Sequence, residues 1–298
     1  MQNTNTILMV RPVAFAYNAE TAVNNKFQAA GNAEAAQVKA LVEFDAFVDK
    51  LRENDIEVIV VDDTPEPHTP DSIFPNNWIS FHNGTIVLYP MYAANRRAER
   101  KQAVLDMIND KFNVTETIDL TGYETENTFL EGTGSMVLDR KNKIAYACLS
   151  ERTSKTALED FCAKMNYKPC SFTATDANGN VIYHTNVMMS VADEYVIICL
   201  ESIKDTDEQS NVVATIEKTG KEILPISFEQ MNRFAGNMLQ LENKKGEKIL
   251  IMSEQAHKSL TYEEISNLQK YNRIVYSKLD TIEMNGGGSA RCMIAEVF

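Results

Sequence analysis

Short runs of apolar residues recur along the chain in a fixed order, and this order is the strongest signal in the sequence. Each unit has a strand, a tight turn, a second strand, a helix and a third strand, with β-branched or aromatic residues enriched in the strands. Turn dipeptides such as Asn83-Gly84 and Lys245-Gly246 separate the paired strands. The pattern predicts a repeated ββαβ unit.

Four complete units follow one another between residues 78 and 277. In the order strand, strand, helix and strand, their predicted segments are Trp78–Phe81, Thr85–Tyr89, Asn95–Lys111 and Thr115–Leu120; Ser135–Leu138, Lys143–Leu149, Ser150–Met165 and Lys168–Phe172; Val187–Val191, Glu194–Leu200, Asp207–Thr219 and Glu222–Ile226; and Met238–Leu241, Lys248–Met252, Tyr262–Tyr271 and Arg273–Ser277. We expect the four units to share one structure.

A fifth unit is divided between the two ends of the chain. Cys292–Phe298 is its predicted first strand and Thr6–Val10 its second. A helix from Asn32, the expected N-cap, to Asn54 and the strand Glu57–Val61 complete it. The segment from Arg11 to Gly31 is a long loop inserted into this unit.

Five such units around an axis predict an α/β fold that closes into a pseudo-fivefold ring with the helices outside. The divided unit would lock the ring by pairing the two ends, so residues 1–298 are expected to form a single catalytic domain. The alternative is an open α/β sheet, but such sheets use βαβ crossovers rather than a hairpin in every unit.

A junction rich in small and polar residues precedes the first strand of each unit. The five junctions are Phe74-Pro75-Asn76-Asn77, Leu130-Glu131-Gly132-Thr133-Gly134, Tyr183-His184-Thr185-Asn186, Ala235-Gly236-Asn237 and Gly288-Ser289-Ala290-Arg291-Cys292. In a closed ring all five would face one central cavity, so side chains far apart in sequence would converge there.

Three of these side chains have the chemistry of a catalytic site. Cys292 follows three glycines, which allow close backbone approach, and can act as a nucleophile. His184 can act as a general acid or base, and Glu131 can orient the histidine or bind substrate nitrogens. Each residue alone also fits a structural role, but their places at matching points of the repeat favour an active site.

Two arginine-containing segments open predicted helices and can hold a substrate carboxylate. They are Ser150-Glu151-Arg152-Thr153 and Arg96-Arg97-Ala98-Glu99. An arginine binds a carboxylate through two parallel hydrogen bonds. Both segments also fit an ordinary solvated helix start, and this alternative is stronger for Arg96 than for Arg152.

Composition excludes several classes of function. The net charge of −13 argues against binding to nucleic acid or to an anionic membrane surface. No apolar run reaches the roughly 18 residues of a membrane span, and no signal peptide is recognisable.

Five cysteines without tight spacing indicate reduced thiols, so we expect a cytoplasmic protein. CxxC and HExxH motifs are absent, and we expect no metal and no cofactor. A homo-oligomer is compatible with the sequence.

Several of the motifs in this sequence resemble those of one family, the guanidine-modifying enzymes. This family includes arginine deiminases, dimethylarginine dimethylaminohydrolases and amidinotransferases. The resembling motifs are Pro70-Asp71-Ser72-Ile73-Phe74 (family Pro-Asp-Ser-Val-Phe), Leu130-Glu131-Gly132 (Glu-Gly-Gly-Asp, from which Thr133-Gly134 departs), Leu149-Ser150-Glu151-Arg152-Thr153 (Leu-Ser-x-Arg-Thr), Arg96-Arg97-Ala98-Glu99 (Arg-Arg-x-Glu) and Gly286-Gly287-Gly288 with Cys292-Met293, the nucleophile motif. The resemblance covers nearly the whole chain and implies a five-bladed α/β propeller.

The resemblance also implies a set of site residues. Cys292, His184 and Glu131 would be catalytic, and Arg152 would bind the carboxylate of the amino acid. The expected substrate-binding residues are Asp71, Phe74, Asn76, Asn77, Arg97, Arg152, Asn186 and Asn237.

Two departures from the family bear on the substrate. Asn77 stands at the position of an aspartate that binds the guanidinium, and Asn186 at the position of an aspartate that follows the catalytic histidine in arginine deiminases. A buried guanidinium would lose counter-charge there, at a cost of roughly several kcal/mol, whereas a neutral ureido group would not. In this respect the chain looks like the amidinotransferase-related citrulline-utilisation hydrolases.

The sequence therefore predicts a cysteine-dependent hydrolase of non-peptide C–N bonds that acts on a ureido or guanidino amino acid, with citrulline favoured. An arginine deiminase and an amidinotransferase are alternatives within the same family. A non-catalytic, propeller-like binding or scaffold protein is the alternative from another class.

Overall fold

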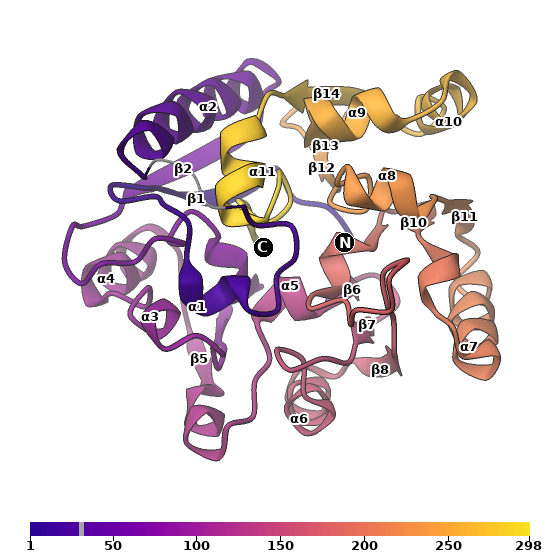
Figure 1. Ribbon diagram of the computed structural model, residues 1–298, viewed down its shortest axis with the longest axis horizontal. Coiled ribbons are helices and arrows are strands. Elements are labelled where there is room, and N and C mark those ends of the chain that lie inside the picture. Colours follow the sequence, from indigo (N-terminus) through magenta and orange to yellow (C-terminus); the bar gives the residue numbers. More distant parts are fainter. Residues whose placement is uncertain (30–32) are drawn as a thin grey trace.

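The computed structural model describes residues 1–29 and 33–298, and the predicted N-cap Asn32 lies outside this part of the chain. Five three-stranded sheets surround a central axis, and the longer helices lie on the outside (Figure 1). In each sheet the middle strand pairs antiparallel with one neighbour and parallel with the other. The predicted α/β class and the pseudo-fivefold ββαβ repeat are confirmed.

The strands agree with the predicted segments to within a few residues at each end. In spatial order the sheets are β15 (Ala295–Val297), β1 (Thr6–Arg11) and β2 (Glu57–Asp62); β3 (Ile79–His82), β4 (Thr85–Leu88) and β5 (Glu116–Asp119); β6 (Val137–Asp139), β7 (Ile144–Cys148) and β8 (Lys168–Phe172); β9 (Met189–Val191), β10 (Tyr195–Ile198) and β11 (Glu222–Pro225); β12 (Leu239–Glu242), β13 (Lys248–Ser253) and β14 (Arg273–Ser277).

The helices of the described residues connect the second and third strands of a unit or lie between one unit and the next. The α-helices are α1 (Ala19–Ala22), α2 (Ala33–Glu53), α3 (Ala94–Arg97), α4 (Gln102–Lys111), α5 (Gly132–Ser135), α6 (Lys155–Met165), α7 (Thr206–Glu217), α8 (Phe228–Asn232), α9 (Glu254–Ser259), α10 (Tyr262–Leu268) and α11 (Asp280–Gly286). The short 3-10 helices are η1 (Pro75–Asn77), η2 (Thr121–Glu126), η3 (Thr185–Val187) and η4 (Leu200–Ser202).

The two ends of the chain close the ring. β1 pairs with β15, with Thr6 opposite Val297 and Leu8 opposite Ala295, as the divided unit predicted. On one side β15 contacts β3, and on the other the Glu242 N–H donates to the Thr4 carbonyl at 3.1 Å. β9 contacts both β6 and β12, so the sheets join from unit to unit.

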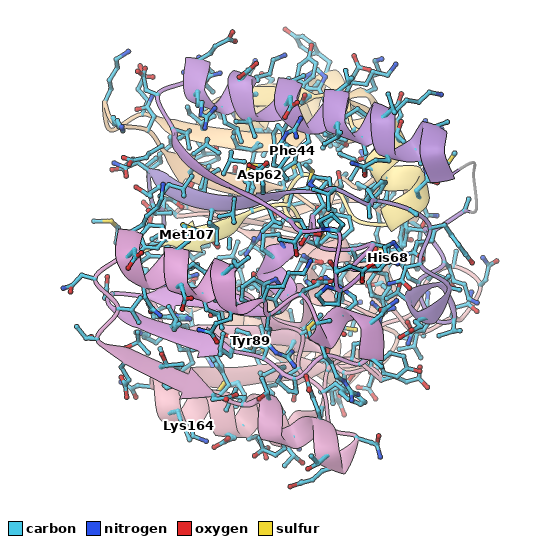
Figure 2. All side chains as sticks on the ribbon, turned by 90° about the vertical axis from the view of Figure 1, so that its left-hand side faces the viewer. Phe44, Asp62, His68, Tyr89, Met107 and Lys164 are labelled. Atoms are coloured by element: carbon cyan, nitrogen blue, oxygen red, sulfur yellow. The ribbon has the colours of Figure 1, made fainter. Side chains whose placement is uncertain are left out.

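Amphipathic helices cover the outer parts of the sheets. In α2 the buried residues recur every three or four positions, and they include Phe44, Phe47 and Leu51, which pack with the β1 residues Ile7 and Met9. Figure 2 shows Phe44 on the side of α2 that faces the sheet. Burial of such side chains stabilises the fold by roughly 1.5–3 kcal/mol each.

Two predicted helices differ from the observed ones. The segment Asn95–Lys111 is divided into α3 and α4 because Lys101 has an extended backbone, with ψ of 136°. The helix expected from Ser150 begins only at Lys155, because Ser150 and Thr153 form a tight turn through two backbone hydrogen bonds of 3.3 and 3.1 Å. This turn brings Arg152 to the central cavity rather than to an exposed helix surface.

Candidate active site

All five junctions meet at the centre of the ring, as the repeat predicted. Residues from three of them, Phe74, Asn77, Tyr183, His184, Gly288 and Cys292, line one small cavity. The other two junctions contribute Glu131, which contacts His184, and Asn237, which contacts Cys292. The structure thus brings together side chains that are more than 200 residues apart in the sequence.

Cys292 lies in the turn before β15, where its backbone N–H donates to the Ser289 carbonyl at 3.0 Å. The turn passes so close to its neighbours that a Cβ at Gly288 would lie 2.9 Å from the Phe74 ring and 3.2 Å from the Cys292 Cβ. The side chains of Asn186 and Asn237 donate to Sγ at 3.3 and 3.2 Å. Two amide donors on one sulfur stabilise the thiolate, which is the nucleophilic form of cysteine.

His184 and Glu131 form a buried pair, with 2.7 Å between Nε2 and Oε2. Burial works to raise the pKa of Glu131, but the Arg152 guanidinium and the histidine lower it to about 2. Burial lowers the pKa of His184 to about 4, although the bond to Glu131 acts in the opposite direction. At neutral pH the pair is therefore a carboxylate and a neutral imidazole. Since a carboxylate only accepts, Nε2 holds the hydrogen and Nδ1 is left as a proton acceptor.

Gly134 explains one departure from the family motif. A Cβ at this position would lie 2.4 Å from Asn77 Nδ2 and 2.8 Å from His184 Nδ1, both too close for any side chain. An aspartate at the fourth position of the Glu-Gly-Gly-Asp motif would therefore not fit this packing. The glycine places Asn77 beside the proton-accepting nitrogen of His184.

Arg152 and Arg96 line the cavity, whereas Arg97 does not. Arg152 is 2% exposed, and its guanidinium lies 3.6 Å from Glu131 Oε2 and 4.9 Å from the centre of the Tyr183 ring. Arg97 donates to the carbonyls of Met91 and Tyr92 instead and is about one third exposed. Of the two adjacent arginines, Arg96 therefore faces the cavity, whereas the sequence analysis had expected Arg97 to be the substrate-binding residue.

The remaining expected residues are all buried near the cavity. Asp71 lines it, and its Oδ2 accepts from Asn18 at 2.8 Å and from Thr21 at 3.1 Å. Asn76 accepts from Asn77 Nδ2 at 3.1 Å, and a Cβ at Gly132 would lie 2.3 Å from the Asn76 carbonyl oxygen. Asn76 is therefore a neighbour of the cavity rather than part of its lining.

The N-terminal loop, here residues 19–28 with α1 at its start, covers the cavity, and no sequence motif indicated this. Thr21, Asn25 and Gln28 are part of the lining, and Gln28 donates to the Gly286 carbonyl at 2.8 Å. Arg152 donates to the Thr21 carbonyl at 2.6 Å and to the Asn24 side-chain oxygen at 2.9 Å. The space left is about 10 Å³, room for roughly one water molecule. A molecule of the size of an amino acid does not fit into this space.

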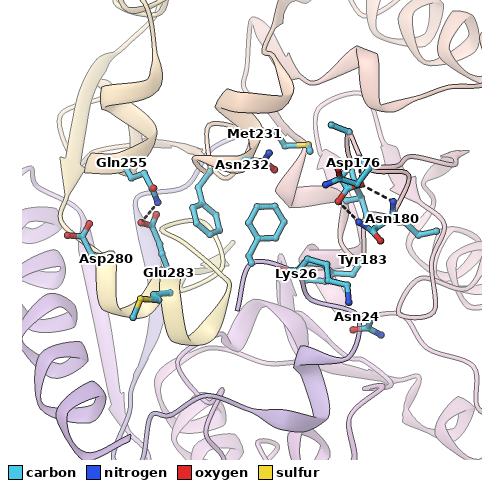
Figure 3. A pocket seen from close by; sticks show the side chains of 17 residues that line it. Asn24, Lys26, Asp176, Asn180, Tyr183, Met231, Asn232, Gln255, Asp280 and Glu283 are labelled. Atoms are coloured by element: carbon cyan, nitrogen blue, oxygen red, sulfur yellow. Dashed lines mark hydrogen bonds between the residues drawn. The ribbon is translucent and has the colours of Figure 1, made fainter. Parts of the chain in front are cut away.

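A larger groove of about 790 Å³ adjoins the cavity on the other side of Tyr183 (Figure 3). The loop residues Asn24, Lys26 and Phe27 form one wall, and Phe27 packs on Phe234 with 5.2 Å between ring centres. Tyr183 lines both the groove and the cavity that contains Cys292.

The described residues contain no cluster of three histidine, cysteine, aspartate or glutamate side chains suited to a metal ion. None of the helices in this part of the chain is both long and apolar enough to cross a membrane.

Comparison with known proteins places the chain in a family. The model of the family "N,N dimethylarginine dimethylhydrolase, eukaryotic" matches residues 11–298. None of the curated proteins compared with the chain is significantly similar to it in sequence.

Solved structures share the fold at low sequence identity. The N-terminal domain of ArgZ, an arginine dihydrolase from the ornithine–ammonia cycle in cyanobacteria, was solved with bound product; it is 17% identical, with a TM-score of 0.78 over 98% of this chain and 97% of that domain. An AgrE variant bound to L-arginine is 17% identical, with a TM-score of 0.77 over 98% of this chain and 40% of that chain. A dimethylarginine dimethylaminohydrolase variant, an adduct with S-methyl-L-thiocitrulline, is 14% identical, with a TM-score of 0.70 over 99% of both chains.

The family match, the five ββαβ units and the enclosed cysteine, histidine and glutamate agree with one another. The chain belongs to the dimethylarginine dimethylhydrolase family and is a C–N hydrolase of the amidinotransferase-like superfamily.

Proposed function

We propose that the protein hydrolyses the ureido group of a free amino acid, citrulline or a close relative, through a covalent adduct on Cys292. The observation that carries the proposal is that the polar side chains bonded to the sulfur are the amides of Asn186 and Asn237. Asn77, another amide, lines the same cavity. Amides bind a neutral ureido group by hydrogen bonds without providing the counter-charge that a guanidinium requires.

The charged groups of the cavity suit the carboxylate and the ammonium group of an amino acid. Arg152 would exchange its bonds to Thr21 and Asn24 for bonds to the substrate carboxylate. Asp71 Oδ1 is buried and has no hydrogen-bond partner among the described residues, and burial raises the pKa of this carboxyl. A substrate ammonium would supply the missing partner.

The reaction follows from this placement. The Cys292 thiol gives its proton to His184 Nδ1 as Sγ attacks the ureido carbon, and His184 then gives this proton to the departing nitrogen as the C–N bond to the amino-acid side chain breaks. Ornithine leaves and an S-carbamoyl group remains on the cysteine. Water, deprotonated by His184, then attacks the same carbon and breaks the C–S bond, and the carbamate released decomposes to ammonia and carbon dioxide. Glu131 holds the imidazole throughout.

Arginine is the second candidate, because ArgZ is described as an arginine dihydrolase and AgrE binds L-arginine. In this chain a guanidinium substrate would enter a cavity that already contains the guanidinium groups of Arg96 and Arg152. The carboxylates of Glu99 and Glu131 are engaged by these arginines, and Asp71, the third carboxylate, would be taken by the ammonium group of the substrate. An additional buried cation would therefore be poorly compensated.

A substrate screen tests the proposal. Purified protein is incubated with citrulline, arginine and dimethylarginine, and the release of ornithine, citrulline and ammonia is measured. We expect kcat/KM for citrulline to exceed that for arginine by about 100-fold or more, which corresponds to about 3 kcal/mol for an uncompensated cation. Cys292→Ala should be folded and inactive.

The double variant Asn77→Asp with Asn186→Asp should shift the preference toward arginine. A kcat/KM for arginine above that for citrulline in the wild-type protein would instead identify an arginine deiminase or dihydrolase. Turnover only of a guanidino donor together with an amine would identify an amidinotransferase, and binding without turnover of any of these compounds a non-catalytic protein.

A further inference from the structure

Arg96 contacts Asn77, an amide that lines the central cavity. Its NH1 donates to Asn77 Oδ1 at 2.7 Å, and both side chains line the cavity that contains Cys292 and His184. Arg96 is 2% exposed, so the contact is protected from water. The sequence had favoured its neighbour Arg97 as a binding residue and had assigned Arg96 no contact with Asn77.

This contact leaves the Asn77 amide with one orientation. A guanidinium has only donors, so the oxygen of the amide must point toward Arg96 and its NH₂ group away. Asn77 Nδ2 donates to Asn76 Oδ1 at 3.1 Å, which agrees with this assignment. Nδ2 also lies on the side of Gly134 and His184, where the chemistry takes place. Asn77 therefore presents a donor, and not an acceptor, toward the reacting group.

Arg96 is itself held in place by buried partners. Its Nε and NH2 donate to the two carboxylate oxygens of Glu99 at 2.7 and 3.0 Å, and NH2 also donates to the Phe74 carbonyl at 3.3 Å. Asp71 lies 3.8 Å from Nε. Burial works against the charge of Arg96, but Glu99 and Asp71 raise the pKa of its guanidinium above the usual value. With these bonds made, the guanidinium has little capacity left to bind a substrate carboxylate directly.

We propose that Arg96 determines the choice of a ureido over a guanidino substrate by holding Asn77 with its NH₂ group toward the substrate. This inference rests on the proposed function and deepens it. A ureido group has a carbonyl oxygen that accepts from this NH₂ group. A guanidinium has only N–H groups, which would face another N–H and remain unpaired. Arg96 is thus a positioning residue that acts through Asn77.

The test compares the ratio of kcat/KM for citrulline to kcat/KM for arginine among variants. Arg96→Met keeps the length of the side chain and removes its donors, and the double variant Arg96→Met with Glu99→Gln avoids an unpaired carboxylate if the single variant is unstable. We expect either variant to lower the ratio by at least about tenfold, because Asn77 is then free to turn its oxygen toward the substrate. General damage to the fold lowers both rates together and leaves the ratio unchanged.

Two controls separate the effect of the orientation of the Asn77 amide from the effect of the charge of Arg96. Arg100→Met removes a largely buried arginine of the same segment, which bonds to Glu124 and to the Tyr89 carbonyl outside the cavity, and should leave the ratio unchanged. In an Asn77→Ala background there is no amide to orient, so Arg96→Met should change the ratio by less than about threefold. An equally large change in that background would show that the charge of Arg96 acts directly, and would overturn the inference.

Binding of citrulline and arginine to Cys292→Ala, measured by calorimetry, separates this inference from the proposed reaction. If Cys292→Ala prefers citrulline and loses the preference with Arg96→Met, the inference holds even where the wild-type protein does not hydrolyse citrulline. If the wild-type protein hydrolyses citrulline but its ratio is unaffected by Arg96→Met, the inference is wrong and the proposed function stands. A preference for arginine, or binding of neither amino acid, would overturn both.

Discussion

The thiolate of Cys292 provides the most direct test of the site geometry, through the variant Asn186→Leu. The change removes the donor that lies 3.3 Å from Sγ and leaves the second donor, from Asn237, in place. Asn186 Oδ1 has no hydrogen-bond partner among the described residues, so its loss leaves no other polar group unsatisfied there. Leucine has nearly the same shape as asparagine, and the variant therefore isolates one N–H···S contact.

The magnitude follows from the charge of the acceptor. A hydrogen bond to a charged group contributes about 1.5–3 kcal/mol. Because each 1.4 kcal/mol is tenfold, the rate of alkylation of Cys292 should fall about 10- to 100-fold. Asn186→Asp places a carboxylate beside the sulfur and should lower this rate further.

The assay is the second-order rate of iodoacetamide alkylation at pH 7, with the modified peptide identified by mass spectrometry. Burial raises the pKa of Cys148, Cys162 and Cys199 to about 12 and also raises that of Cys170, so these thiols should react slowly. The covering loop is the same in both proteins, and its opening cancels in the ratio of rates. Rates within a factor of two would refute the assignment of Asn186 as a thiolate donor.

Two further predictions concern substrate anchoring and pH. Arg152→Ala should lower kcat/KM by roughly 10- to 100-fold, with KM raised and kcat reduced, because binding of the carboxylate positions the reacting carbon; unchanged steady-state kinetics would locate the clamp elsewhere. Burial raises the pKa of Glu283 from 4.5 to about 7, so the folded protein loses stability relative to Glu283→Gln as pH rises through this range. Chemical unfolding of the two proteins should diverge by about 2–3 kcal/mol between pH 4.5 and pH 7, and parallel curves would contradict this.

The sequence alone determined the repeat and therefore the fold. The alternation of hairpin turns, apolar strands and helical segments is local, and β-strand and helix periodicities are encoded by neighbouring residues. The divided unit even predicted that Thr6–Val10 pairs with the C-terminal strand. Equivalent positions in a repeat face the same axis, so the convergence of Cys292, His184 and Glu131 followed from the same pattern.

Only the tertiary structure decided which of the two residues, Arg96 or Arg97, lines the cavity. Adjacent residues on a helix point about 100° apart, and the sequence does not say which direction faces inward. The sequence did contain a partner for Arg96, because Glu99 follows it by three residues and the two side chains can pair. Pairs with this spacing also form on exposed helices, so the spacing did not show that Arg96 is buried.

The position of the covering loop over the cavity depended on tertiary structure even more strongly than the choice between the two arginines. Thr21 and Asn24 have no hydrophobic periodicity around them, and their bonds to Arg152 join positions about 130 residues apart. Such contacts are formed by side-chain and backbone polar groups that any loop contains, so their partners become defined only when the ring has closed. Local pattern thus determined the repeating units, and long-range polar pairing inside the ring decided which groups face the substrate.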